Sequence, residues 1–106
     1  MTELIKKIAA AAAVDYRFDC GKSTYARVLV TSPDVVTELE AELGYDIRSV
    51  AIDAECVEGR YHGSLLIDGH ASVTLGAEVD NALGREVMKN LNSMPSAYLT
   101  PSYSVE

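Results

Sequence analysis

The dipeptide Asp68-Gly69 separates two short runs in which apolar and polar residues alternate. Both residues tolerate positive φ, so the pair predicts a tight two-residue turn between two antiparallel strands. The strand before the turn covers 60–67 and the strand after it covers 71–75. A further alternating run over 46–57 precedes them, and together the three runs predict a three-stranded antiparallel meander.

Helical spacing of apolar residues predicts helices over 2–13, 33–43 and 77–92. Alternation over 14–20, turn residues, and a second run over 24–31 predict a hairpin between the first two helices. The predicted order is αββαβββα. Strands joined by tight turns, with helices between them, indicate an α+β domain with a mostly antiparallel sheet.

The apolar residues of the run 14–20 alternate with charged residues, as expected of a half-buried strand. They are therefore expected on one side of the strand, towards the core. These residues are Val14, Tyr16, Phe18 and Cys20.

Gly84 lies inside the helix predicted over 77–92, where glycine costs about 1 kcal/mol relative to alanine. Its presence predicts a place where the helix approaches another part of the backbone closely. The small residues at 9–13 are the expected counterpart, because alanine permits close approach.

A chain of 106 residues with 48% hydrophobic content is expected to form a single domain with its own core. We assign this domain to 1–94. Residues 95–106 are rich in Ser, Pro and Tyr, and are predicted to form an extended tail that docks on a sheet edge.

The net charge of −7 disfavours direct binding of nucleic acid or of an anionic membrane, and is compatible with a basic protein partner. No apolar run reaches the length of a membrane span. Two cysteines without a CxxC pair favour a reducing cytoplasm over a secreted, disulfide-rich setting.

The segment Gly21-Lys22-Ser23 matches the end of a phosphate-binding loop. Such a loop also needs a glycine where this chain has Tyr16, and a helix after the lysine, where this chain has a predicted strand. The segment is therefore interpreted as a hairpin turn, and no nucleotide cofactor is expected.

His62 and His70 do not match a zinc pattern, and the predicted turn places their side chains on opposite faces of the sheet. No metal site is expected from them. Cys56 continues an apolar alternation and is expected to be a buried, inert thiol. Cys20 lies beside a turn and is expected to be the more accessible cysteine.

Asp53 and Glu55 share one strand face, as paired catalytic carboxylates do. Nothing near them in the sequence supplies a pocket or a partner, so no catalytic residue is assigned.

The helix predicted over 33–43 has an unusual charge balance, since it carries acidic residues and no basic residue. Like charges four residues apart repel, and acids near a helix C-terminus oppose the dipole. The plain interpretation is a solvated face of an acidic protein. The alternative is a surface selected to bind a positively charged partner, with two acids of the next strand extending it. The residues of this predicted interface are Asp34, Glu38, Glu40, Glu42, Asp53 and Glu55.

These observations predict a non-enzymatic, cytoplasmic protein-binding domain. In its most concrete form it is an inhibitor or regulator, of the kind encoded by viruses and mobile elements. Such a protein mimics nucleic acid and occupies the basic surface of a nucleic-acid-handling protein. Two alternatives stay open: a small-ligand-binding protein or enzyme with a pocket between sheet and helices, and a self-assembling structural protein. A homodimer is compatible with any of them.

Overall fold

The computed structural model describes residues 2–69 and 71–98, and its elements follow the order αββαβββα. The predicted α+β class is confirmed. The helices are α1 (Thr2–Ala10), α2 (Pro33–Leu43) and α3 (Ala77–Asn90), the last continued by a short 3₁₀ helix η1 (Leu91–Ser93). The strands are β1 (Ala12–Cys20), β2 (Ser23–Val30), β3 (Val50–Val57), β4 (Arg60–Ile67) and β5 (Ala71–Val73).

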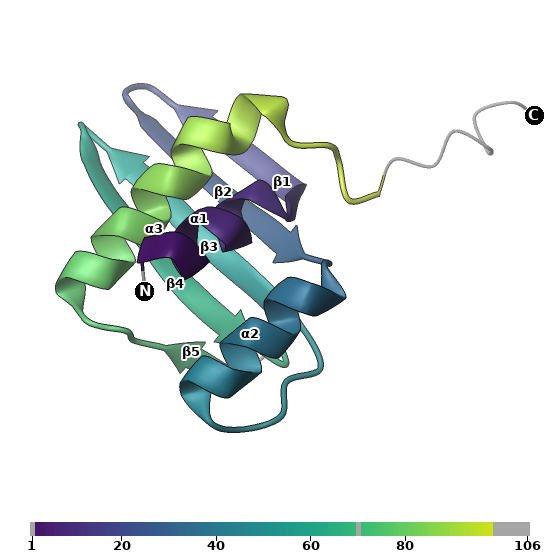
Figure 1. The fold of residues 1–106 in the computed structure, drawn as a ribbon. Helices are drawn as coiled ribbons and strands as arrows, with labels where there is room; N and C mark the ends of the chain where they lie inside the picture. Colours follow the sequence, from purple (N-terminus) through teal and green to yellow (C-terminus); the bar gives the residue numbers. More distant parts are fainter. Residues whose placement is uncertain (1, 70, 99–106) are drawn as a thin grey trace, which may run out of the picture.

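The five strands form one antiparallel sheet in the order β1-β2-β3-β4-β5, so neighbours in the sheet are also neighbours in the chain. All three helices lie on the same face of this sheet, with α1 between α3 and α2 (Figure 1). The opposite side, which we call the open face, carries no helix in the described part of the chain. No described helix is long and apolar enough to cross a lipid bilayer.

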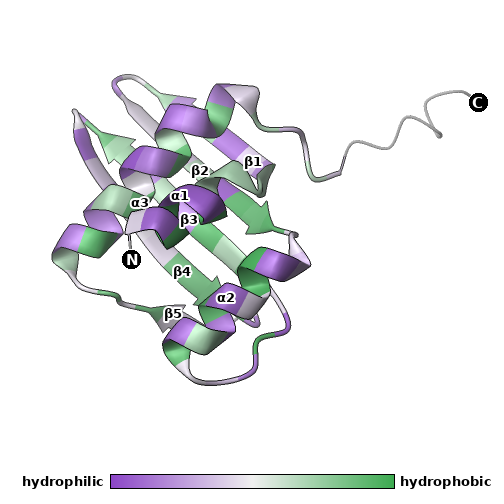
Figure 2. Ribbon diagram, viewed as in Figure 1, coloured by the Kyte–Doolittle hydropathy of each residue, from purple (hydrophilic) through white to green (hydrophobic). Residues whose placement is uncertain are grey.

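The core lies between the helices and the sheet. Buried residues alternate along β2, β3 and β4, and the outward surfaces of α1 and α2 are mainly hydrophilic (Figure 2). The largest fully buried side chains are Ile8, Val28, Leu39, Ile52, Leu65, Leu83 and Val87.

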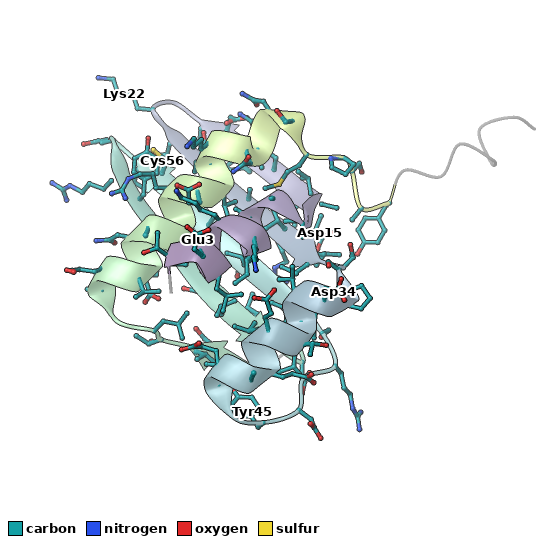
Figure 3. The ribbon with its side chains drawn as sticks, in the orientation of Figure 1. Glu3, Asp15, Lys22, Asp34, Tyr45 and Cys56 are labelled. Atoms are coloured by element: carbon teal, nitrogen blue, oxygen red, sulfur yellow. The ribbon has the colours of Figure 1, made fainter. Side chains whose placement is uncertain are left out.

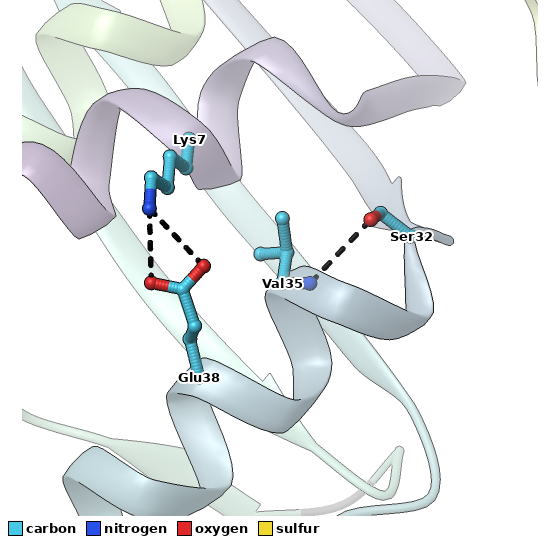
Figure 4. Close-up of polar contacts among 4 residues, drawn as sticks. All are labelled: Lys7, Ser32, Val35 and Glu38. Carbon is cyan, nitrogen blue, oxygen red and sulfur yellow. Dashed lines mark hydrogen bonds and ion pairs between the residues drawn. The ribbon is translucent and has the colours of Figure 1, made fainter.

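Helix α2 has the boundaries predicted from its capping residues. The Val35 N–H donates to Ser32 Oγ over 3.4 Å at the start of the helix (Figure 4). At the other end Gly44 has φ +86°, and its N–H donates to the Glu40 carbonyl oxygen at 2.7 Å.

The prediction of a helix over 2–13 is wrong at its C-terminal end. Helix α1 ends at Ala10, and Ala12 and Ala13 belong to β1, where they pair with Val30 and Leu29. Ladder hydrogen bonds and burial of both alanines outweigh their helix propensity.

The turn predicted at Asp68-Gly69 forms with positive φ at both residues, +55° and +81°. It is longer than predicted, because Ile67 pairs with Ala71 and the connection spans residues 68–70. The Asp68 carboxylate accepts hydrogen bonds from the backbone N–H groups of Arg48 and Ser49, at 2.6 and 3.1 Å, which ties the turn to the segment before β3. His70, which was expected on the opposite sheet face from His62, lies outside the described residues.

A β-bulge in β1 changes which residues of this strand face the core. Val14 pairs with Val28, but the next pair joins Tyr16 to Arg27, which leaves Asp15 as an extra residue. Beyond the bulge the alternation is reversed, and Tyr16 and Phe18 lie on the open face with 50% and 58% of their surface exposed. The expectation that Tyr16, Phe18 and Cys20 face the core with Val14 is therefore wrong.

The close approach predicted at Gly84 exists, but its partner is β4 and not residues 9–13. A Cβ atom on Gly84 would lie 2.6 Å from the backbone nitrogen of His62. The glycine allows α3 to lie directly on β4. Helix α1 also packs beside α3, but Gly84 is not the point of close approach between these two helices.

The segment after η1 docks on the outer edge of β1. The Val14 N–H donates to the Pro95 carbonyl at 2.8 Å, and the Ala97 N–H donates to the Val14 carbonyl at 2.7 Å. Ser96 and Val14 thus form a parallel bridge. Residues 99–106 of the predicted tail lie outside the described residues.

Candidate functional site

The six acidic residues predicted to form one interface lie on opposite sides of the sheet. Along β3, Asp53 and Glu55 alternate with the core residues Ile52 and Ala54, so they belong to the open face. Helix α2 packs on the other face of the sheet. Asp53 and Glu55 therefore do not extend the acidic helix. The acids of α2 are Asp34, Glu38, Glu40 and Glu42.

Two acids of α2 are paired with groups elsewhere in the fold. Lys7 Nζ of α1 donates to both carboxylate oxygens of Glu38, at 3.1 and 3.2 Å (Figure 4). Glu40 Oε2 accepts a hydrogen bond of 2.8 Å from the backbone N–H of Ile47. Asp34 and Glu42 are exposed and make no hydrogen bond or ion pair with other described residues. The acidic surface of α2 is thus smaller than its sequence indicated.

On the open face, Arg27 of β2 forms a forked ion pair with Asp53 of β3. Its Nε and Nη2 atoms donate to the two carboxylate oxygens at 2.6 and 2.9 Å. The guanidinium carbon lies 5.7 Å from the ring centroid of Tyr16, within the range of a cation–π contact. The hydrogen bonds to Asp53 raise the pKa of Arg27 above its usual value. Arg27 is therefore a fixed cation held between a ring and a carboxylate.

The neighbouring row of residues across the strands contains aromatic rings, a carboxylate and a histidine, but no arginine. Tyr25 of β2 stands directly opposite Glu55 of β3, and Glu55 stands opposite His62 of β4. Phe18 lies on the other side of Tyr25, with ring centroids 6.4 Å apart. The Glu55 carboxylate makes no hydrogen bond or ion pair within the described part of the chain. His62 is at the sheet edge, with Nε2 4.0 Å from Asp80 Oδ2 of α3.

A concavity of about 230 Å³ lies over these two rows on the open face. It combines aromatic rings, carboxylates and small polar groups on a floor of two alanines. Its lining residues are Tyr16, Tyr25, Ala26, Asp53, Ala54, Glu55, His62 and Ser64.

The chemistry of this concavity favours binding of a cation. Aromatic faces and carboxylates both attract positive charge. Acid–base catalysis by the two carboxylates would need one of them to donate a proton and the other to accept one, with both able to reach the substrate. Both oxygens of Asp53 are already bonded to Arg27, so Glu55 is the carboxylate of this concavity that has no partner in residues 2–69 and 71–98.

Sequence reasoning selected Asp53 and Glu55 but missed the tyrosines beside them. Tyr16 reaches this face only through the bulge at Asp15, which the alternation did not reveal. Tyr25 could have been found, because it alternates with the buried residues Ala26 and Val28 in the same strand.

The glycine–lysine turn, the two cysteines and the possible metal ligands do not form further candidate sites among the described residues. Gly21 and Lys22 form the two-residue turn between β1 and β2, so a strand and not a helix follows the lysine, which projects from the hairpin tip (Figure 3). Cys20 is exposed, as predicted, and Cys56 is half-buried where full burial was expected. The described residues contain no group of three side chains that could hold a metal ion.

A second, wider hollow of about 610 Å³ lies between α2 and the adjacent ends of β2 and β3. Its apolar lining includes Leu29, Val36 and Ile47. Glu40 is the one acidic residue among its lining residues, and its carboxylate already accepts a hydrogen bond from the Ile47 backbone N–H.

Comparison of the chain with protein-family models, curated proteins and solved structures gave no significant match. The functional assignment therefore depends on the surfaces described above.

Proposed function

We propose that this domain is a non-enzymatic protein-binding module of the cytoplasm that recognises a positively charged surface of its partner through the open face. The observation that carries the proposal is the group of exposed aromatic side chains beside a free carboxylate on that face. Tyr16, Phe18 and Tyr25 expose 50%, 58% and 38% of their surface there. Clustered aromatic residues of this kind are enriched in the cores of protein interfaces.

The charge of the domain supports a basic partner. The net charge is −7, and the carboxylate that Glu55 contributes to the open face has no counter-ion among the described residues. Complementary charge accelerates association and selects between partners. In its most concrete form the module is an inhibitor or regulator that occupies the basic surface of a nucleic-acid-handling protein.

The test is affinity capture from a lysate of the source cells, followed by quantitative mass spectrometry and binding measurements with the purified partner. The informative variant is Phe18→Ser, which removes an exposed ring of the open face without changing charge. The matched control is Tyr45→Ser, which removes a ring that is 48% exposed at the end of α2, far from the β1–β2 turn (Figure 3).

We expect the parent and Tyr45→Ser to capture the same basic protein, and Phe18→Ser to bind it about tenfold more weakly. Full affinity of Phe18→Ser would exclude the open face as the interface. If Glu42→Lys loses affinity while Phe18→Ser keeps it, α2 and not the open face is the interface. Capture of only this chain, with dimers in sedimentation, would support the self-assembling alternative.

A further inference from the structure

The open face contains an internal example of how it binds a guanidinium group. Arg27 lies against the ring of Tyr16 and donates two hydrogen bonds to Asp53. The next row also contains a ring and a carboxylate, Tyr25 and Glu55, but here the ring is on β2, at the strand position that Arg27 holds in the first row. In that row no cation of the described residues is paired with the carboxylate.

We propose that the concavity at Tyr25 and Glu55 binds the guanidinium group of an arginine side chain on the partner. That the arginine belongs to a protein partner rests on the function proposed above. The bound group would lie against the ring of Tyr25 and donate to the two oxygens of Glu55, and would thus contact the same two kinds of group that Arg27 contacts in Tyr16 and Asp53. The guest would supply the positive charge that Arg27 supplies to Asp53 in the first row.

The register of the sheet supports this geometry. Tyr25 faces Glu55 directly across the β2–β3 ladder, so this ring and this carboxylate are on adjacent strands, whereas Tyr16 and Asp53 are separated by the strand that carries Arg27. Directly opposite side chains start from Cβ atoms about 5 Å apart, so a group resting on one reaches the other. The concavity of about 230 Å³ leaves room for a guanidinium and part of its aliphatic chain. Ser64 offers a hydroxyl acceptor at the same hollow.

Arginine fits this arrangement better than lysine. A guanidinium is planar, stacks on an aromatic ring, and matches a carboxylate with two parallel donors. An ammonium group is a compact, strongly hydrated charge that gains less from the ring and from the fork. The site is therefore expected to discriminate between two side chains of equal charge.

The experiment is an NMR titration of the ¹⁵N-labelled full chain, at low salt, with the peptide acetyl-Gly-Arg-Gly-amide. The matched probe is acetyl-Gly-Lys-Gly-amide, which has the same charge. We expect saturable shifts in the amides of Tyr25, Glu55 and their neighbours on β2–β4, with millimolar Kd and about threefold tighter binding of the arginine peptide.

The variant Glu55→Gln keeps the shape of the side chain and should weaken the arginine peptide about fivefold. The control Glu42→Gln removes an equally free acid from α2 and should bind like the parent. Tyr25→Leu removes the ring and should abolish the preference for arginine. The ¹⁵N spectrum of each variant reports directly whether it is folded.

Equal binding of the two peptides, shifts centred on α2, or unchanged binding in Glu55→Gln would each overturn the proposal. The two proposals can fail separately. If the arginine peptide binds here while Phe18→Ser keeps full affinity for the captured partner, the site stands and the open-face interface fails. If Phe18→Ser loses the partner while the peptides do not bind, the interface stands and the arginine site fails.

Discussion

Gly63 of β4 and Gly84 of α3 face each other with no side chain between helix and strand. A Cβ atom on Gly63 would lie 2.8 Å from the backbone nitrogen of Gly84, a distance that real Cβ atoms do not adopt. The two glycines therefore set how closely α3 lies on the sheet, and neither position accepts even a methyl group without a backbone shift.

Gly84→Ala is expected to lower the free energy of unfolding by about 1–3 kcal/mol, because overpacking outweighs the roughly 1 kcal/mol gained in helix propensity. Chemical denaturation measures this change. The control Asn81→Ala, at an exposed site of the same helix, should leave stability unchanged or raise it by a few tenths of a kcal/mol. An equally stable Gly84→Ala would show that α3 can move off the strand at little cost.

The acids of α2 should respond differently to charge reversal. Glu42→Lys places a cation near the helix C-terminus and removes repulsion, so it should stabilise the domain by a few tenths of a kcal/mol. Glu38→Lys replaces the ion pair with Lys7 by a repulsive pair, and should destabilise it by a similar amount. Thermal unfolding at low salt compares the two variants, and added salt should reduce the difference between them.

The pKa of Asp19 is held below its usual value, chiefly by the hydrogen bond from Thr24 and secondly by Arg17. The contribution of these contacts to stability is therefore present at neutral pH, and is lost as the pH falls through the pKa of the folded state. Thr24→Val should raise the pKa of Asp19 towards the normal range. An NMR pH titration of its side-chain carboxyl carbon measures the shift, and an unchanged titration curve would exclude Thr24 as the main cause.

The bridge between residues 95–97 and β1 is open to a similar test. Ala97→Pro removes the N–H that donates to the Val14 carbonyl, and should cost about 1 kcal/mol. Ser96→Ala keeps every backbone donor and serves as the control. Hydrogen exchange at the Val14 amide should become faster only in the proline variant. Unchanged protection of the Val14 amide would mean that its hydrogen bond to the Pro95 carbonyl persists without the bond from Ala97.

Elements whose ends are set by neighbouring residues could be predicted from the sequence, and elements whose ends depend on distant partners could not. Helix α2 was predicted to the residue because Ser32, Pro33 and Gly44 act on the backbone beside them. The end of α1 was misplaced because Ala12 and Ala13 are in β1 for a reason outside their own segment, namely pairing with β2. Propensity carries no information about such a distant partner.

The candidate site could be predicted only in part for the same reason. Asp53 and Glu55 were recognisable by their spacing, but the counter-ion of Asp53 comes from another strand, and Tyr16 comes through a bulge that has no clear signature in the sequence. The difference between a neutralised carboxylate and a free one depends on register, which is set by the whole sheet.

The meander order of the sheet also has a consequence for how the domain assembles. The hairpins β1–β2 and β3–β4 each form from adjacent segments, whereas the β2–β3 pair must close over the whole of α2. Local contacts form early and longer closures later. The opposed residues Tyr25 and Glu55 belong to this last seam, so the two halves of the concavity meet only when the hairpins join. A nascent or partly unfolded chain is thus expected to have no affinity for the arginine side chain proposed to bind here, and binding would report completed folding.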